Sequence, residues 1–145
     1  MTRAWTACGI ALPLLAALAL TTPVSGQHRR SIWDGAYTDA QADRGFALYK
    51  SKCTTCHGPA LGGAIDGGPP LRGTEFFLRW SGTAMDDMVN QISELMPSEN
   101  PNSLKRQEYV DIITFLLRSN GVPAGQKDLA ADDAVLSTWE FTEKR

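Results

Sequence analysis

Residues 53–57 read Cys-Thr-Thr-Cys-His, and this pentapeptide is the stretch from which the fold can be inferred. Two cysteines separated by two residues and followed directly by a histidine suit the covalent attachment of a c-type haem. The thiols add to the two vinyl groups of the porphyrin, and the adjacent imidazole becomes an axial ligand of the iron. We therefore expect one haem, attached through Cys53 and Cys56 and ligated by His57.

The same cysteine pair could instead form a redox dithiol or half of a zinc site. A dithiol of the thioredoxin type lies in a βαβ pattern, and the sequence shows none. A structural zinc site needs four ligands, and outside residues 53–57 the chain offers only Cys8 and His28 as further cysteine or histidine ligands. Both lie near the N-terminus, so the haem interpretation is favoured.

The first 26 residues read as a secretory signal peptide. Arg3 supplies a basic start, residues 7–20 form an apolar run, and small residues at 21–26 precede a cleavage point before Gln27. The run is shorter than the roughly 20 apolar residues of a membrane span, although an uncleaved anchor is an alternative. We expect a periplasmic protein of about 119 residues, without a membrane span after cleavage.

The charge composition of the chain argues against a nucleic-acid partner. The formal net charge is −2, and no block of Lys or Arg indicates nucleic-acid binding. A mature chain of this length buries only a modest core, so a bound haem is expected to act as its hydrophobic centre.

Hydrophobic periodicity predicts an all-α protein of helices joined by loops. Helices are expected over residues 39–53, 84–95 and 104–120, with a short one over 75–80. Residues 58–73 are rich in Gly and Pro. This stretch either wraps closely around a flat cofactor or forms a flexible surface loop, and composition does not separate the two.

Residues at the ends of these helices support their boundaries. Thr38 and Gln41 have capping-box spacing at the start of the first helix. Ser103 is a good N-cap for the third helix, and Gly121 suits the position just past its end. Gly45 is unexpected inside a helix, and a close approach by another helix would explain it.

These features resemble a class I, mono-haem cytochrome c over about residues 40–121. Gly45 and Tyr49 precede Cys53 by eight and four residues, as the family's glycine and aromatic residue do. The resemblance implies the class I cytochrome c fold, in which the N- and C-terminal helices cross at this glycine. Phe115 then corresponds to the aromatic that packs at the crossing.

The segment Gly68-Pro69-Pro70-Leu71-Arg72-Gly73 resembles the family's Gly-Pro-x-Leu-x-Gly sequence. The resemblance implies that the carbonyl of Pro69 accepts a hydrogen bond from the Nδ1–H of His57. Trp80 stands where the family often has a tryptophan near a haem propionate. An ordinary core position is the alternative for this residue.

The chain is expected to divide into the signal peptide (1–26), an N-terminal extension (27–38), the cytochrome domain (39–122) and a C-terminal extension (123–145). The extensions resemble those of small cytochromes that accompany periplasmic quinoprotein dehydrogenases. Their aromatic residues are expected to pack on the domain, with docking to a partner as the alternative. These residues are Trp33, Trp139 and Phe141.

The second axial ligand is predicted to be Met96. It lies just past the apolar stripe of the second helix and directly before Pro97, as the distal ligand does in many class I cytochromes. Its soft, neutral thioether favours ferrous iron. Met85 and Met88 fall on the stripe, where a core role is the default; either of them, His28 or an open position is the alternative.

Two protein ligands leave the iron no position for a substrate, so we expect a one-electron carrier and not an enzyme. Its partners would be redox donor and acceptor proteins, for example a periplasmic dehydrogenase and a terminal oxidase. A permanent cytochrome subunit of a dehydrogenase complex is the main alternative. A haem enzyme or ligand sensor would need a vacant distal position, and an enzyme also a nearby acid–base group.

Overall fold

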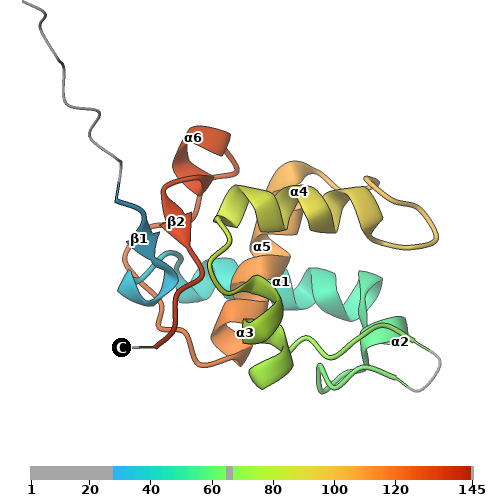
Figure 1. Cartoon of the computed structure of the whole chain (residues 1–145). Coiled ribbons are helices and arrows are strands. Elements are labelled where there is room, and N and C mark those ends of the chain that lie inside the picture. Colours follow the sequence, from blue (N-terminus) through green and yellow to red (C-terminus); the bar gives the residue numbers. More distant parts are fainter. Residues whose placement is uncertain (1–27, 65–66, 145) are drawn as a thin grey trace, which may run out of the picture.

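The computed structural model describes residues 28–64 and 67–144, so the predicted signal peptide lies outside the described residues. The all-α fold class is confirmed, because helices dominate the described chain (Figure 1). One pair of two-residue strands was not predicted. The elements in chain order are β1 (Arg30–Ser31), a 3₁₀ turn (Ile32–Asp34), α1 (Asp39–Lys52), α2 (Thr54–His57), α3 (Thr74–Trp80), α4 (Met85–Leu95), α5 (Arg106–Ser119), α6 (Asp133–Leu136) and β2 (Trp139–Glu140).

Helices α1 and α5 cross at Gly45, as the resemblance implied (Figure 1). A Cβ on residue 45 would lie 1.8 Å from the backbone oxygen of Asp111, so only glycine allows this approach. The ring of Phe115 packs beside the crossing, with its centroid 5.2 Å from the rings of Phe46 and Tyr49. The helix pair therefore forms the central contact of the fold.

The start of α1 is capped by Thr38, whose Oγ1 accepts a hydrogen bond of 3.1 Å from the N–H of Gln41. The other half of the predicted capping box, a bond from the side chain of Gln41 back to the N–H of Thr38, is wrong. The side chain of Gln41 is fully buried, and it bonds to both the N–H and the carbonyl of Leu129, at 2.7 and 2.9 Å. A buried amide needs both a donor and an acceptor, and the C-terminal extension supplies them.

Helix α5 begins later than predicted, with Lys105 and not Ser103 at its N-cap. The carboxylate of Glu108 accepts a 2.7 Å hydrogen bond from the N–H of Lys105, which closes the first turn there. The predicted C-terminal end is correct to within one residue. Gly121 follows it with a φ of 78°, a conformation that favours glycine.

Helix α4 buries the apolar stripe predicted for it, with Met85, Met88 and Val89 fully buried. Leu95 departs from the pattern, because 51% of its surface is exposed. The side chain lies at the end of α4, where it lines the cavity described below.

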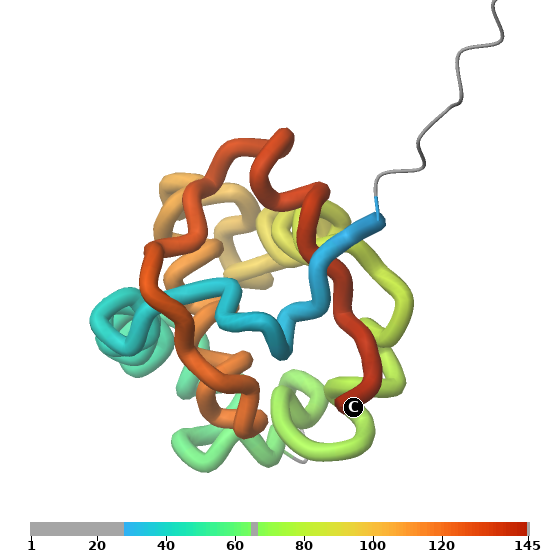
Figure 2. Tube along the Cα trace, turned by 90° about the vertical axis from the view of Figure 1, so that its left-hand side faces the viewer, coloured from blue at the N-terminus to red at the C-terminus, as the bar shows by residue number. Residues whose placement is uncertain are grey.

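The two extensions lie side by side across one face of the molecule (Figure 2). Strands β1 and β2 pair in parallel, and the guanidinium of Arg30 stacks 3.8 Å above the ring of Trp139. The indole N–H of Trp33 donates to the carbonyl of Thr142 at 2.9 Å. Trp139 and Phe141 are buried, so the predicted packing of these aromatics on the domain is confirmed.

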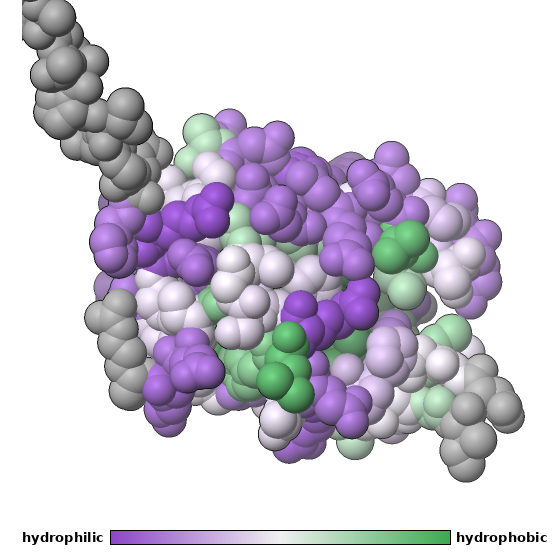
Figure 3. Space-filling view, viewed as in Figure 1, coloured by the Kyte–Doolittle hydropathy of each residue, from purple (hydrophilic) through white to green (hydrophobic). Residues whose placement is uncertain are grey.

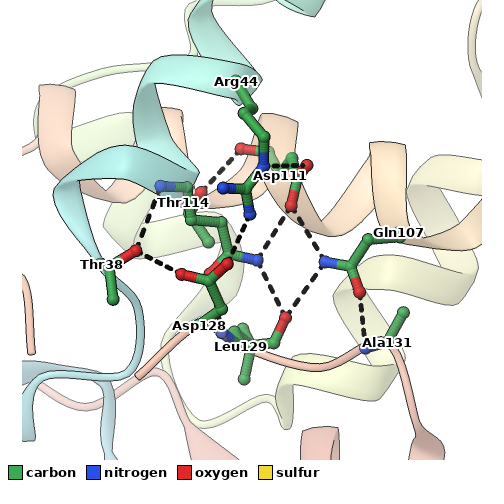
Figure 4. Close-up of polar contacts among 9 residues, drawn as sticks. Thr38, Arg44, Gln107, Asp111, Thr114, Asp128, Leu129 and Ala131 are labelled. Carbon is green, nitrogen blue, oxygen red and sulfur yellow. Dashed lines mark hydrogen bonds and ion pairs between the residues drawn. The ribbon is translucent and has the colours of Figure 1, made fainter. Parts of the chain in front are cut away.

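A polar cluster around the buried Gln41 and Asp111 fixes the C-terminal extension to both central helices (Figure 4). The carboxylate of Asp111 accepts hydrogen bonds from Gln41 and Gln107, each of 2.9 Å, and from Arg44 at 3.2 Å. Arg44 also forms an ion pair of 2.6 Å with Asp128. The Thr38 hydroxyl and Arg44 together hold the pKa of Asp128 below its usual range. The segment around Leu129 is thus an integral part of the domain.

None of the helices in the described part of the chain has both the length and the apolar character needed to cross a membrane.

Candidate functional site

One cavity gathers all six site residues predicted from the sequence. It is bounded by the end of α1, by α2 and α3, by the C-terminal end of α4 and by α5. In the space-filling view, apolar patches lie over part of α3 and at the end of α4, with hydrophilic surface between them (Figure 3). The six residues are Cys53, Cys56, His57, Pro69, Trp80 and Met96.

The walls of this cavity are largely apolar, and among the residues that the structure describes three charged side chains line it. The charged residues are Lys52, Arg79 and Glu99. The apolar lining residues include Leu71, Phe76, Ile92, Leu95, Leu104, Ile112 and Leu116. Such a lining excludes water from whatever the cavity holds.

The imidazole of His57 is buried, and its Nδ1 lies 2.9 Å from the carbonyl oxygen of Pro69. A carbonyl oxygen can only accept, so this contact requires the proton on Nδ1. In the neutral imidazole Nε2 then carries the lone pair, which is the form that coordinates a metal. Gly68 lies directly against the ring and closes this side of the site.

Cys53 lies between α1 and α2, Cys56 lies within α2, and both are partly buried. Burial, with a smaller contribution from Cys56, raises the pKa of the Cys53 thiol to about 11. The two cysteines are close together because only two residues separate them, and the N–H of Cys56 donates to the carbonyl of Cys53 at 3.3 Å. Both thiols therefore line the cavity beside the imidazole that follows them.

Met96 is the only methionine of the described residues that lines the cavity. Its N–H ends α4 by donating to the carbonyl of Ile92 at 2.8 Å. Met85 and Met88 are fully buried in the core and do not line it. His28 is exposed at the start of the described chain and does not line it either.

Trp80 is a core residue that also lines the cavity, and its proximity to a haem propionate stays a prediction. It is buried against Phe141, with ring centroids 6.3 Å apart, and it also lines the cavity. The C-terminal extension thereby supports a wall of the site.

Three polar contacts that hold the site together were not predicted. The hydroxyl of Tyr49 donates to the carbonyl of Gly58 at 2.6 Å, and that of Tyr109 donates to the carbonyl of Met96 at 2.8 Å. The amide of Asn120 donates to the carbonyl of Leu71 at 3.0 Å. Periodicity identifies the tyrosines as helix-face residues, but it contains no signal for a partner in a distant loop.

The donor set fits a covalent haem. Two thiols at the required spacing, an imidazole with a free Nε2 and a thioether all line one apolar cavity. Gly68 packs so closely on the ring of His57 that a side chain at position 68 would overlap the imidazole.

A crossed pair of terminal helices and a cavity with these donors define a c-type cytochrome domain. Over residues 40–116 the chain matches the family model described as cytochrome c oxidase, cbb3-type, subunit III, and it belongs to this family. No match was found among curated proteins or among solved structures. The domain accordingly has a haem-based electron-transfer role and works with redox partners.

Proposed function

We propose that this protein is a periplasmic one-electron carrier that holds one haem c through Cys53 and Cys56, with His57 and Met96 as axial ligands. The observation that carries the proposal is the meeting of an imidazole with a free Nε2 and a single thioether in one apolar cavity. When bound, the haem supplies an iron centre that alternates between the ferric and ferrous states.

Several groups around the cavity contribute to the proposed function. The Pro69 carbonyl holds the proton on Nδ1 of His57, which fixes the tautomer and strengthens Nε2 as a donor. The thioether of Met96 favours the ferrous state and raises the potential. The apolar walls keep water out, and the indole N–H of Trp80 is proposed to donate to a propionate.

Two protein ligands leave no iron position for a substrate, which is why we propose a carrier and not an enzyme. The chain has two histidines, and the one other than His57 is His28, which does not line the cavity. Of the charged side chains that line it in the described part of the chain, Glu99 is the only carboxylate. Its Oε1 lies 3.8 Å from Sγ of Cys56.

The carrier is proposed to exchange electrons with a donor such as a periplasmic dehydrogenase and with an acceptor such as a terminal oxidase. The matched family is described as an oxidase subunit, which makes an oxidase the first acceptor to test. A permanent subunit of a dehydrogenase complex is the alternative. Trp139 and Phe141 are buried and the indole N–H of Trp33 is bonded within the domain, which supports the carrier over the permanent subunit.

Carbon monoxide binding to the ferrous protein tests the proposed ligation. Wild type should not bind it, whereas Met96→Ala should bind it readily because the sixth position is open. Met88→Leu is the matched control, since Met88 is fully buried and does not line the cavity. Ready binding by wild type would overturn the ligation and return catalysis or ligand sensing to consideration.

Intact mass and cell fractionation test export and attachment. A mature chain beginning at Gln27 and carrying the mass of one haem, recovered from the periplasm, is the expected result. An uncleaved N-terminus in the membrane fraction would favour the anchored alternative. Elution of the native protein in a stable complex would favour the permanent subunit.

A further inference from the structure

The chain contains three tyrosines, and all of them are buried with the hydroxyl donated to a backbone carbonyl. Tyr37 bonds to Val122, Tyr49 to Gly58 and Tyr109 to Met96, over distances of 2.6, 2.6 and 2.8 Å. Only the last of these bonds ends on a proposed ligand residue itself. Tyr109 is therefore the residue to test, and Tyr37 and Tyr49 serve as comparisons.

The backbone of Met96 is held from two helices. Its N–H donates to Ile92 in α4, and its carbonyl accepts the hydroxyl of Tyr109 from α5. The same hydroxyl lies 3.4 Å from the N–H of Leu104, at the far end of the loop that Met96 begins. Both ends of the loop over residues 96–104 are therefore joined to one phenol group.

Tyr109 is well suited to hold this loop in place. Its side chain is 1% exposed and projects from α5, which is anchored by its crossing with α1 at Gly45. Its ring also lines the cavity. A phenol has only two rotatable side-chain bonds to its ring, so little conformational freedom is lost when its hydroxyl is fixed.

We propose that Tyr109 is a positioning residue, which keeps the thioether of Met96 at the iron by bonding the Met96 carbonyl. This inference rests on the proposed ligation by Met96. Without the hydroxyl, the state in which the loop has moved and the sulfur is displaced becomes relatively more favourable. Loss of one buried hydrogen bond corresponds to about a fivefold shift in that equilibrium.

Titration of the ferric holoprotein with imidazole measures the shift directly, because imidazole binds only where the sulfur has left. Loss of the sulfur-to-iron charge-transfer band reports the exchange. Tyr109→Phe keeps the buried ring and should bind imidazole about fivefold more tightly than wild type. Tyr37→Phe removes an equivalent hydroxyl that does not line the cavity and should bind imidazole as wild type does.

Urea unfolding of both variants separates positioning from general stability. Both should lose similar stability, and only Tyr109→Phe should change imidazole binding. Unchanged imidazole binding by Tyr109→Phe, or an equal change in Tyr37→Phe, would overturn the proposal. If wild type lacks the charge-transfer band, Met96 is not an iron ligand. The proposal for Tyr109 is then wrong as well, and this outcome is distinguished from the others because it is seen in wild type before any substitution.

Discussion

Gly68 packs flat against the imidazole of His57, so closely that a Cβ on residue 68 would lie 2.3 Å from Cε1 and 2.5 Å from Nδ1. Real Cβ atoms are not found at such distances from ring atoms. The N–H of Gly68 also donates to the carbonyl of Cys56 at 2.9 Å, which ties this backbone to the haem-attachment segment. The orientation of the imidazole therefore depends on the absence of a side chain at position 68.

Gly68→Ala should displace the imidazole and break its hydrogen bond to Pro69. The cysteines are untouched, so the haem should remain covalently attached while the low-spin visible spectrum is lost or weakened. Gly62→Ala is the control, because a Cβ there meets nothing within 4 Å. A Gly68→Ala spectrum identical to that of wild type would contradict the described packing.

Gly45→Ala should force α1 and α5 apart, because its Cβ would overlap the Asp111 carbonyl. We expect the free energy of unfolding to fall by about 3 kcal/mol, the upper range for overpacking a tight contact. Urea unfolding followed by circular dichroism measures this. A loss no greater than that of Gly62→Ala would show that the helices do not cross as closely as described.

Gln41→Leu should release the C-terminal extension. The substitution removes the side-chain bonds to Leu129 and Asp111 and leaves the buried N–H of Leu129 without its side-chain partner, whereas the Leu129 carbonyl keeps a 3.1 Å bond from Gln107. The expected loss of stability is about 1–3 kcal/mol. Limited proteolysis should cut the extension faster than in wild type, whereas Gln126→Ala, at an exposed position of the extension, should behave like wild type. Equal protection in the two variants would argue against the role of Gln41.

Stability at alkaline pH should depend on Tyr37. Burial, with a smaller contribution from Asp39, raises the pKa of this tyrosine from its usual 10.0 to about 12. The folded state then retains a proton that the unfolded state has lost, so stability should fall as the pH rises from about 10 to 12. Urea unfolding across this range should show a steeper decline in wild type than in Tyr37→Phe. Parallel declines would mean that Tyr37 ionises normally.

The parts of the structure that could be predicted depend on contacts close in sequence. The spacing of Cys53, Cys56 and His57 is local, and helix periodicity gave the central helices with errors of at most two residues at their ends. Gly45 could be interpreted because a glycine inside a helix needs a reason. Each of these sequence patterns spans no more than the length of one helix.

The parts that could not be predicted depend on contacts distant in sequence. Gln41 has the spacing of a capping-box residue, yet its buried amide is used by Leu129, which lies 88 positions away. Strands β1 and β2 are two residues each, too short for any alternation to appear. The bond from Tyr109 to Met96 is invisible for a similar reason, because helix periodicity marks a buried face but not the partner of a hydroxyl.

The visible spectrum of the purified mature protein, recorded in both oxidation states, tests the central claim most directly. A sharp ferrous α-band together with a ferric sulfur-to-iron charge-transfer band is predicted, because His57 and Met96 would then both ligate a covalently held haem. A high-spin ferric spectrum without that band would contradict the account, since it would mean that the sixth position is open.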